Sequence, residues 1–181
     1  CEQCELKFSE LAVVLSNKKI ENKYNNVVDN IYIDEITQRE KYFLNLYKKI
    51  SHNFNKDKLV LEVGSYYGVF GNIIKPNVKN YSGLELSKHG ADYSKKNYSL
   101  EIFNETIEEH SKKQFKYDII IMADVIEHFS DPFKMLETIE KILKPDGLLI
   151  FTTYNMDSLY AKITGKNYHW ILPMHLFYFS N

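Results

Sequence analysis

The sequence predicts an α/β fold built on a doubly wound, mostly parallel sheet. Short apolar runs alternate along the chain with segments of helical periodicity, a pattern typical of β-α-β units. The run at residues 59–63 shows no polar–apolar alternation, so its strand should be buried on both faces. Gly64 and Gly68 follow this strand directly, which is where ligand-binding loops of such sheets occur.

The first predicted element is a helix over residues 34–51, with Asp34 as its N-cap. Its buried face should carry the apolar side chains that recur at helical spacing, which are Phe43, Leu46, Tyr47 and Ile50. The strand at 59–63 comes next, and the helix after it should end before Pro76.

Three strands are predicted in the middle of the chain, at residues 81–85, 100–104 and 117–124. The second of these three has the weakest pattern and the last has the strongest. Ser87 can cap the helix that follows the first of them. Because helices separate these strands, their connections favour parallel pairing.

The helix after residue 130 has clear boundary signals. Asp131 should be its N-cap and Pro132 its first residue. Its buried face should consist of the apolar side chains Phe133, Leu136, Ile139 and Leu143. The sequence Lys-Pro-Asp-Gly at 144–147 should stop the helix and turn the chain into a fifth strand at 148–154.

Composition indicates a folded protein without charge bias. The 181 residues are 44% hydrophobic, and 23 basic against 24 acidic residues give a net charge of −1. This balance gives no sign of binding to nucleic acid or to an anionic membrane. The apolar stretch at 117–126 is interrupted by Asp118 and Asp124, so it predicts no membrane span. We expect a cytoplasmic protein with a small-molecule substrate, and the sequence leaves its oligomeric state open.

The chain begins with Cys1 rather than methionine, so we expect an N-terminal part to be missing. Cys1 and Cys4 form a single C-x-x-C pair, whereas a structural zinc site needs four ligands. The pair is either two free thiols or the second half of a zinc knuckle with upstream ligands. We therefore separate an N-terminal segment, 1–33, from a domain at 34–181.

In a doubly wound sheet, ligands bind beyond the carboxyl ends of the strands. The glycines of the first loop do not have dinucleotide or phosphate-loop spacing, and no lysine or arginine stands among residues 64–68. Glu62 adds negative charge, so a cationic or neutral ligand such as S-adenosylmethionine fits better than a pyrophosphate. Glu85, after the second strand, is placed to accept hydrogen bonds from both hydroxyls of a ribose. Tyr66 occupies a position where such loops usually keep a small residue.

Several motifs together resemble the class I S-adenosylmethionine-dependent methyltransferases. They are LVLEVGSYYGVF, YSGLELS, YDIIIMADVIEHFSDP, LKPDGLLIFTTYN and HLFYFS. The branch most similar to them contains ubiquinone-biosynthesis O-methyltransferases and sugar C-methyltransferases. The resemblance covers residues 34–181 and implies a Rossmann-like S-adenosylmethionine-binding domain that lacks its C-terminal antiparallel hairpin. The family often has glycine where this chain has Tyr66.

The resemblance also implies an enzyme that methylates oxygen or carbon of a small-molecule or sugar acceptor. The implied cofactor-binding residues are Glu62, Gly64, Ser65, Tyr66, Gly68, Glu85, Leu86, Thr106 and Asp124. Glu105 and Ile107 should accompany Thr106 beside the adenine. Asp124 should face the methionine end of the cofactor or the substrate. Two alternatives stay open: a NAD-dependent oxidoreductase, which the glycine spacing disfavours, and a non-catalytic module that binds the cofactor or nothing.

Asp124, Glu127 and His128 follow the fourth strand at spacings that a helical turn would bring to one face. Three interpretations compete: packing and salt bridging, His128 as the general base for an acceptor hydroxyl, and a divalent metal site. We name His128 and Asp124 as catalytic candidates and assign no metal ligand. His175 is a second candidate base. A cluster of aromatic residues could cover the acceptor or belong to the core, and it contains Trp170, Phe177, Tyr178 and Phe179.

Overall fold

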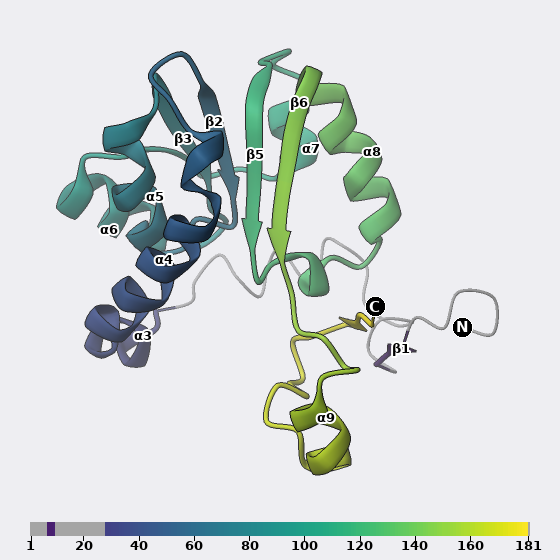
Figure 1. The fold of residues 1–181 in the computed structure, drawn as a ribbon. Coiled ribbons are helices and arrows are strands. Elements are labelled where there is room, and N and C mark those ends of the chain that lie inside the picture. Colours follow the sequence, from purple (N-terminus) through teal and green to yellow (C-terminus); the bar gives the residue numbers. More distant parts are fainter. Residues whose placement is uncertain (1–6, 10–27, 181) are drawn as a thin grey trace.

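The computed structural model describes residues 7–9 and 28–180, and its centre is a five-stranded parallel sheet (Figure 1). The strand order is β4-β3-β2-β5-β6. The strands are β2 (Leu59–Val63), β3 (Asn80–Leu84), β4 (Glu101–Phe103), β5 (Tyr117–Ala123) and β6 (Leu143–Thr152). All four neighbouring pairs are parallel. The prediction of a doubly wound, mostly parallel sheet is therefore confirmed.

Helices cover both faces of this sheet. The helices beside it are α4 (Ile36–Ile50), α5 (Val69–Ile74), α6 (Lys88–Tyr98), α7 (Ile107–Ser111) and α8 (Pro132–Ile142). Short 3-10 helices occur at Ser51–Asn53, Lys75–Asn77, Ile126–His128 and Gly165–Asn167. On β5, Ile119 and Ile121 pack into one core with α4 and α5, whereas Ile120 and Met122 pack into the other with α8. Burial on both faces explains why these strands show no polar alternation.

The start of the first helix differs from the prediction. Asp29, not Asp34, provides the N-cap: its side chain accepts a hydrogen bond from the Tyr32 backbone N–H at 2.9 Å. This bond opens α3 (Asn30–Asp34), of which Asp34 is the last residue. Glu35 precedes α4 without a side-chain cap. The predicted apolar face of α4 does pack against the core. The caps predicted at Ser87 and Asp131 are both present.

The buried face of α8 is only partly the predicted one: Ile139 is buried and Leu136 and Leu143 pack against the core, but Phe133 does not. Met135, Ile139 and Ile142 are buried at i, i+4 and i+7, whereas Phe133 is 67% exposed. Apolar residues occur on two overlapping stripes of this helix, so periodicity alone did not fully identify the face that meets the sheet.

The segment at 144–147 does end the helix, but it then bulges out of β6 instead of forming a turn before it. Tyr117 of β5 pairs with Leu143, and Ile119, two residues on, pairs with Leu148. Lys144 donates from Nζ to the Asp118 carboxylate at 2.9 Å and so ties the bulge to β5.

The C-terminal segment continues beyond the carboxyl ends of the strands. It contains α9 (Leu159–Thr164) and β7 (Phe177–Tyr178), which pairs antiparallel with β1 (Lys7–Phe8) (Figure 1). None of the described helices is long and apolar enough to span a membrane. Cys1 and Cys4 lie outside the described residues, and the division of the chain after residue 33 stays a prediction.

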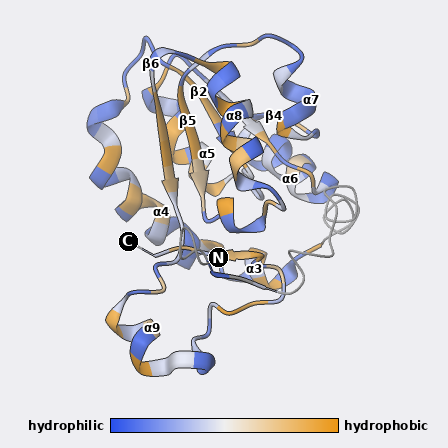
Figure 2. Ribbon diagram, turned by 90° about the vertical axis from the view of Figure 1, so that its right-hand side faces the viewer, coloured by the Kyte–Doolittle hydropathy of each residue, from blue (hydrophilic) through white to orange (hydrophobic). Residues whose placement is uncertain are grey.

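Strand β6 forms one edge of the sheet in the described part of the chain. Its second part, residues 148–151, is apolar (Figure 2), and Leu148 and Phe151 there are 39% and 48% exposed.

Candidate functional site

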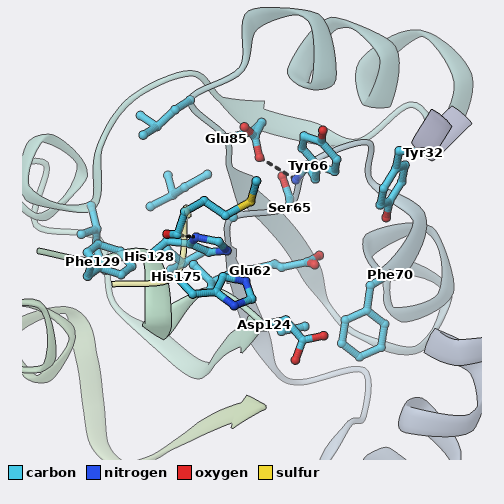
Figure 3. Close-up of a pocket in the computed structure, with 18 of the residues that line it drawn as sticks. Tyr32, Glu62, Ser65, Tyr66, Phe70, Glu85, Asp124, His128, Phe129 and His175 are labelled. Carbon is cyan, nitrogen blue, oxygen red and sulfur yellow. Dashed lines mark hydrogen bonds between the residues drawn. The ribbon is translucent and has the colours of Figure 1, made fainter. Parts of the chain in front are cut away.

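A cavity of about 510 Å³ lies at the carboxyl ends of the parallel strands (Figure 3). Its walls carry six carboxyl groups, which belong to Asp29, Glu62, Glu85, Glu105, Glu108 and Asp124. Among the described residues, Arg39 is the one lysine or arginine that lines it. This charge distribution suits a ligand that offers positive charge and hydrogen-bond donors.

The loop after β2 turns sharply through three residues with positive φ. These angles are 73° at Gly64, 46° at Tyr66 and 75° at Gly68. A Cβ on Gly64 would lie 2.7 Å from the Val125 side chain, so this close approach requires glycine. Gly64, Ser65 and Tyr66 line the cavity, whereas Gly68 begins α5 and does not line it. A contact between Gly68 and a ligand therefore stays a prediction.

The two tyrosines of this loop hold α3 at the rim of the cavity. The Tyr66 hydroxyl donates to Asp29 Oδ2 at 2.9 Å, and the Asp29 backbone N–H donates to the Tyr67 hydroxyl at 2.8 Å. The Tyr32 ring lies 4.7 Å from the Tyr66 ring and 5.2 Å from the Tyr67 ring. Aromatic residues at these loop positions thus attach an additional wall, which includes Asp29 and Tyr32, to the cavity.

Glu85 and Glu62 are both buried beside the loop. Glu85 accepts hydrogen bonds from the backbone N–H groups of Tyr66 and Ser87, each at 2.6 Å. Burial nevertheless raises the pKa of Glu85 to about 7. Burial likewise raises the pKa of Glu62 to about 8, although the Tyr81 hydroxyl donates a hydrogen bond to it. Both side chains line the cavity, so a ligand with donors or positive charge would stabilise their ionised forms.

A second group of lining residues follows β3 and β4. Its members are Leu86, Glu105, Thr106, Ile107 and Glu108. The predicted place of Glu105, Thr106 and Ile107 beside an adenine stays a prediction. The Thr106 hydroxyl and the Glu109 carboxylate form a capping box at the start of α7. Asn104 donates from Nδ2 to the backbone carbonyls of Glu85 and Leu86 at 2.6 and 2.8 Å. These two bonds connect the loop after β3 to the loop after β4, so the two loops form one wall.

Asp124 lines the cavity at the end of β5, with φ at 57°. Its carboxylate accepts hydrogen bonds from the Thr152 hydroxyl at 2.8 Å and from the Tyr42 hydroxyl at 3.1 Å. These bonds direct it toward β6 and α4. The spacing predicted that Asp124, Glu127 and His128 share one face. In the structure Asp124 does not join the other two residues.

Glu127 and His128 are instead joined by His175, from the segment before β7. The rings of His128 and His175 lie beside each other in Figure 3. The three residues each offer one ligand atom, and these atoms lie within 4.8 Å of one another. His128 and His175 form hydrogen bonds through Nδ1 to the backbone carbonyls of Met174 at 3.0 Å and Trp170 at 2.8 Å. A carbonyl only accepts, so each Nδ1 carries the hydrogen and each Nε2 carries a lone pair.

The charge states of this cluster also follow from its burial. Burial lowers the pKa of His128 to about 4 and lowers the pKa of His175, so both rings are neutral at neutral pH. Burial raises the pKa of Glu127 to about 7. Its Oε2 accepts from the Thr153 hydroxyl at 3.1 Å, whereas its Oε1 is buried and accepts no hydrogen bond from any described residue. The arrangement can hold a divalent cation.

The predicted aromatic cover is only partly at the cavity. Trp170 lines it and stacks on Tyr154 at 4.3 Å between ring centroids. The other members of the predicted cluster, residues 177–179, are not among the lining residues. Sequence reasoning missed the lining residues Asp29, Tyr32, Arg39, Tyr42 and Tyr154. No motif indicated them, because they reach the cavity through tertiary packing.

Comparison with known proteins is consistent with this geometry. A family model described as "Methyltransferase domain" matches residues 36–181. The ubiquinone biosynthesis O-methyltransferase of Actinobacillus pleuropneumoniae is 28% identical over 108 residues, or 54% of this chain and 46% of that protein. The enzyme of the same name from Salmonella paratyphi A is 27% identical over 119 residues, or 61% of this chain and 49% of that protein. The chain thus spans about half the length of these relatives.

Solved structures show the same fold. An S-adenosylmethionine-dependent methyltransferase from Archaeoglobus fulgidus superposes with a TM-score of 0.65 at 19% identity, over 82% of this chain and 67% of that one. The plantazolicin methyltransferase in complex with S-adenosylhomocysteine superposes with a TM-score of 0.57 at 19% identity, over 78% of this chain and 54% of that one.

Proposed function

The chain belongs to the family of methyltransferase domains, and we propose that it binds S-adenosylmethionine and transfers the methyl group to a small-molecule acceptor. The observation that carries the proposal is the cavity with six carboxyl groups at the carboxyl ends of the strands. S-adenosylmethionine offers a sulfonium, an ammonium and two ribose hydroxyls, all of which favour carboxylate partners.

Each predicted cofactor residue except Gly68, which does not line the cavity, has a role in this proposal. Glu85 accepts hydrogen bonds from the ribose, and Glu62 and the backbone of residues 64–66 face the aminoacyl end. Leu86 and Thr106 stand beside the adenine. Asp124 closes the site between the methionine end and the acceptor. The support is that all of these residues line one cavity.

A titration distinguishes this cofactor from the nicotinamide alternative. Calorimetry with S-adenosylhomocysteine should show micromolar affinity, and NAD should give no heat of binding. Glu85→Ala should weaken the binding of S-adenosylhomocysteine by about 2–4 kcal/mol, because two hydrogen bonds to an ionised group are lost. Glu137→Ala, on the exposed face of α8, is the control and should bind like wild type. Binding of NAD without a response to S-adenosylhomocysteine would refute the proposal.

We propose a hydroxyl as the acceptor, which the names of the curated relatives support. The acceptor oxygen forms a bond to the methyl carbon while the carbon–sulfur bond breaks and its electron pair stays on sulfur. The hydroxyl proton must leave during this step. The protein contributes alignment of the two reactants and removal of that proton. A sugar carbon is the second candidate acceptor.

The cluster of Glu127, His128 and His175 can assist the removal of that proton, either through a general base or through a bound cation. A base works best when its pKa is near the working pH, and a pKa of about 4 makes His128 a weak base. Two neutral imidazoles with backbone-bonded Nδ1–H groups and a buried carboxylate are the usual ligand set of a divalent cation. We therefore propose that this cluster binds such a cation. A bound cation would lower the pKa of an acceptor hydroxyl, so that the hydroxyl could lose its proton to solvent water.

Titration with Mn²⁺ tests the cluster without knowledge of the acceptor. Mn²⁺ should bind wild type and raise its melting temperature, and a chelator should reverse the increase. Glu127→Gln and His175→Gln should abolish the effect, whereas His52→Gln, an exposed histidine outside the cavity, should preserve it. Equal binding by the Glu127→Gln and His52→Gln proteins would leave His128 as the candidate base.

A further inference from the structure

The outer side of the adenine wall contains a buried polar chain that the proposed reaction does not use. His110 on α7 is fully buried, and both of its ring nitrogens have partners. Its Nδ1 lies 2.7 Å from Glu105 Oε1, and its Nε2 lies 2.7 Å from the Tyr117 hydroxyl. Lys113 donates to the second carboxylate oxygen of Glu105 at 2.6 Å. Glu105 itself lines the cavity.

Charge and hydrogen positions in this chain follow from these contacts. Burial alone would raise the pKa of Glu105, but hydrogen bonds from Lys113 and His110 outweigh it and lower this pKa. The carboxylate is therefore ionised and acts only as an acceptor. His110 must then carry a hydrogen on Nδ1, and in the neutral ring Nε2 accepts from the Tyr117 hydroxyl. Each Glu105 oxygen has one fixed donor and retains acceptor capacity.

The Glu105 carboxylate is placed where it can accept a hydrogen bond from a purine ring in the cavity. The apolar residues Leu84, Leu86 and Ile107 also line the cavity, from the end of β3 and the segments after β3 and β4, and they suit the face of a purine. Adenine carries an exocyclic amino group that donates two hydrogen bonds, whereas hypoxanthine carries a carbonyl oxygen at that position. A carboxylate attracts the first group and repels the second.

We propose that His110, with Lys113, fixes the Glu105 carboxylate as the acceptor for the purine amino group, which makes His110 a positioning residue for adenine recognition. The inference rests on the proposed cofactor. It extends that proposal by assigning base specificity to a residue that does not line the cavity.

Two substitutions of similar polarity separate positioning from packing. In His110→Asn the amide nitrogen falls near the position of Nδ1 and can still donate to Glu105. In His110→Gln the longer side chain reaches the position of Nε2 and keeps the contact with Tyr117 instead. The measurement is the ratio of dissociation constants of S-inosylhomocysteine and S-adenosylhomocysteine, determined by calorimetry. A general loss of packing weakens both ligands and leaves this ratio unchanged.

Wild type should prefer the adenosine ligand by about 10–100-fold, the range expected for a hydrogen bond to an ionised group. His110→Asn should keep this ratio within about twofold, and His110→Gln should lower it about fivefold or more. Glu105→Gln should bring it close to one, because an amide can also donate. Lys113→Met should lower the ratio about threefold. Because the Lys113 side chain is 40% exposed, this variant can replace the His110 variants in the test if they do not fold.

Wild-type affinities within threefold of each other, or equal ratios for wild type and Glu105→Gln, would overturn the inference and leave the proposed cofactor intact. So would equal ratios for the two His110 variants. Failure of wild type to bind S-adenosylhomocysteine at all would instead refute the proposed function, and this inference with it.

Discussion

The affinity of the chain for S-adenosylhomocysteine should increase as pH rises from 6 to 8. Burial raises the pKa of Glu85 to about 7 and that of Glu62 to about 8, so both are largely protonated at pH 6. A bound ribose and ammonium group favour the ionised carboxylates. Binding must therefore release protons, and the ligand itself keeps its charges over this range.

The pKa of Glu85 sets the size of the contribution that Glu85 makes to this effect. With a pKa of about 7, the ionised fraction is roughly 0.1 at pH 6 and roughly 0.9 at pH 8. If only the ionised form binds, the dissociation constant falls about tenfold, which is about 1.4 kcal/mol. Ionisation of Glu62 on binding makes the dependence steeper, and the two carboxyls titrate as a coupled pair.

Calorimetry at pH 6, 7 and 8 gives the dissociation constants. Repeating the titration at pH 6.5 in two buffers of different ionisation enthalpy gives the number of protons released. Glu85→Gln should bind more weakly and release fewer protons than wild type. A dissociation constant that stays within twofold between pH 6 and 8, or an uptake of protons, would refute the reasoning.

Three further predictions concern stability. Gly68→Ala should lower the free energy of unfolding in urea by about 1–3 kcal/mol, since φ is 75° and the new Cβ would lie 2.7 Å from Ser94 Oγ; unchanged stability would contradict this. Tyr66→Phe should cost about 0.5–1.5 kcal/mol in the same assay, because Asp29 loses a hydrogen-bond donor, and a stabilised variant would refute it. Burial raises the pKa of Glu127 from its ordinary value of 4.5 to about 7. Its contribution to stability is therefore present at low pH and is lost as pH rises through 7. Glu127→Gln should therefore show a smaller fall in melting temperature between pH 5 and 8 than wild type, and parallel curves would show that Glu127 does not titrate as described.

The sheet and its ligand edge could be predicted because they depend on local patterns. Apolar runs without polar alternation, separated by helices, predict a parallel sheet. The carboxyl ends of its strands then predict where the cavity lies. Glu62, Glu85 and Asp124 were predicted in this way, each from its place directly after or at the end of a strand, and each lines the cavity.

Residues that depend on tertiary packing could not be predicted. Asp29 reaches the cavity because Tyr66 and Tyr67, 37 and 38 positions away, bind it through hydrogen bonds. His175 joins Glu127 although 48 positions separate them in the sequence. Periodicity gives no information about such pairs. It fails similarly at one position of α8, where Phe133 was predicted on the buried face and is 67% exposed.

The edge strand β6 has a practical consequence for work with residues 1–181. An extended edge with exposed apolar side chains recruits other extended segments by backbone pairing, and Leu148 and Phe151 give β6 this character in the described part of the chain. Concentrated samples of these residues should therefore self-associate through this edge. Light scattering over a dilution series should be measured before any calorimetric titration. Otherwise the heat of self-association would be counted as heat of ligand binding.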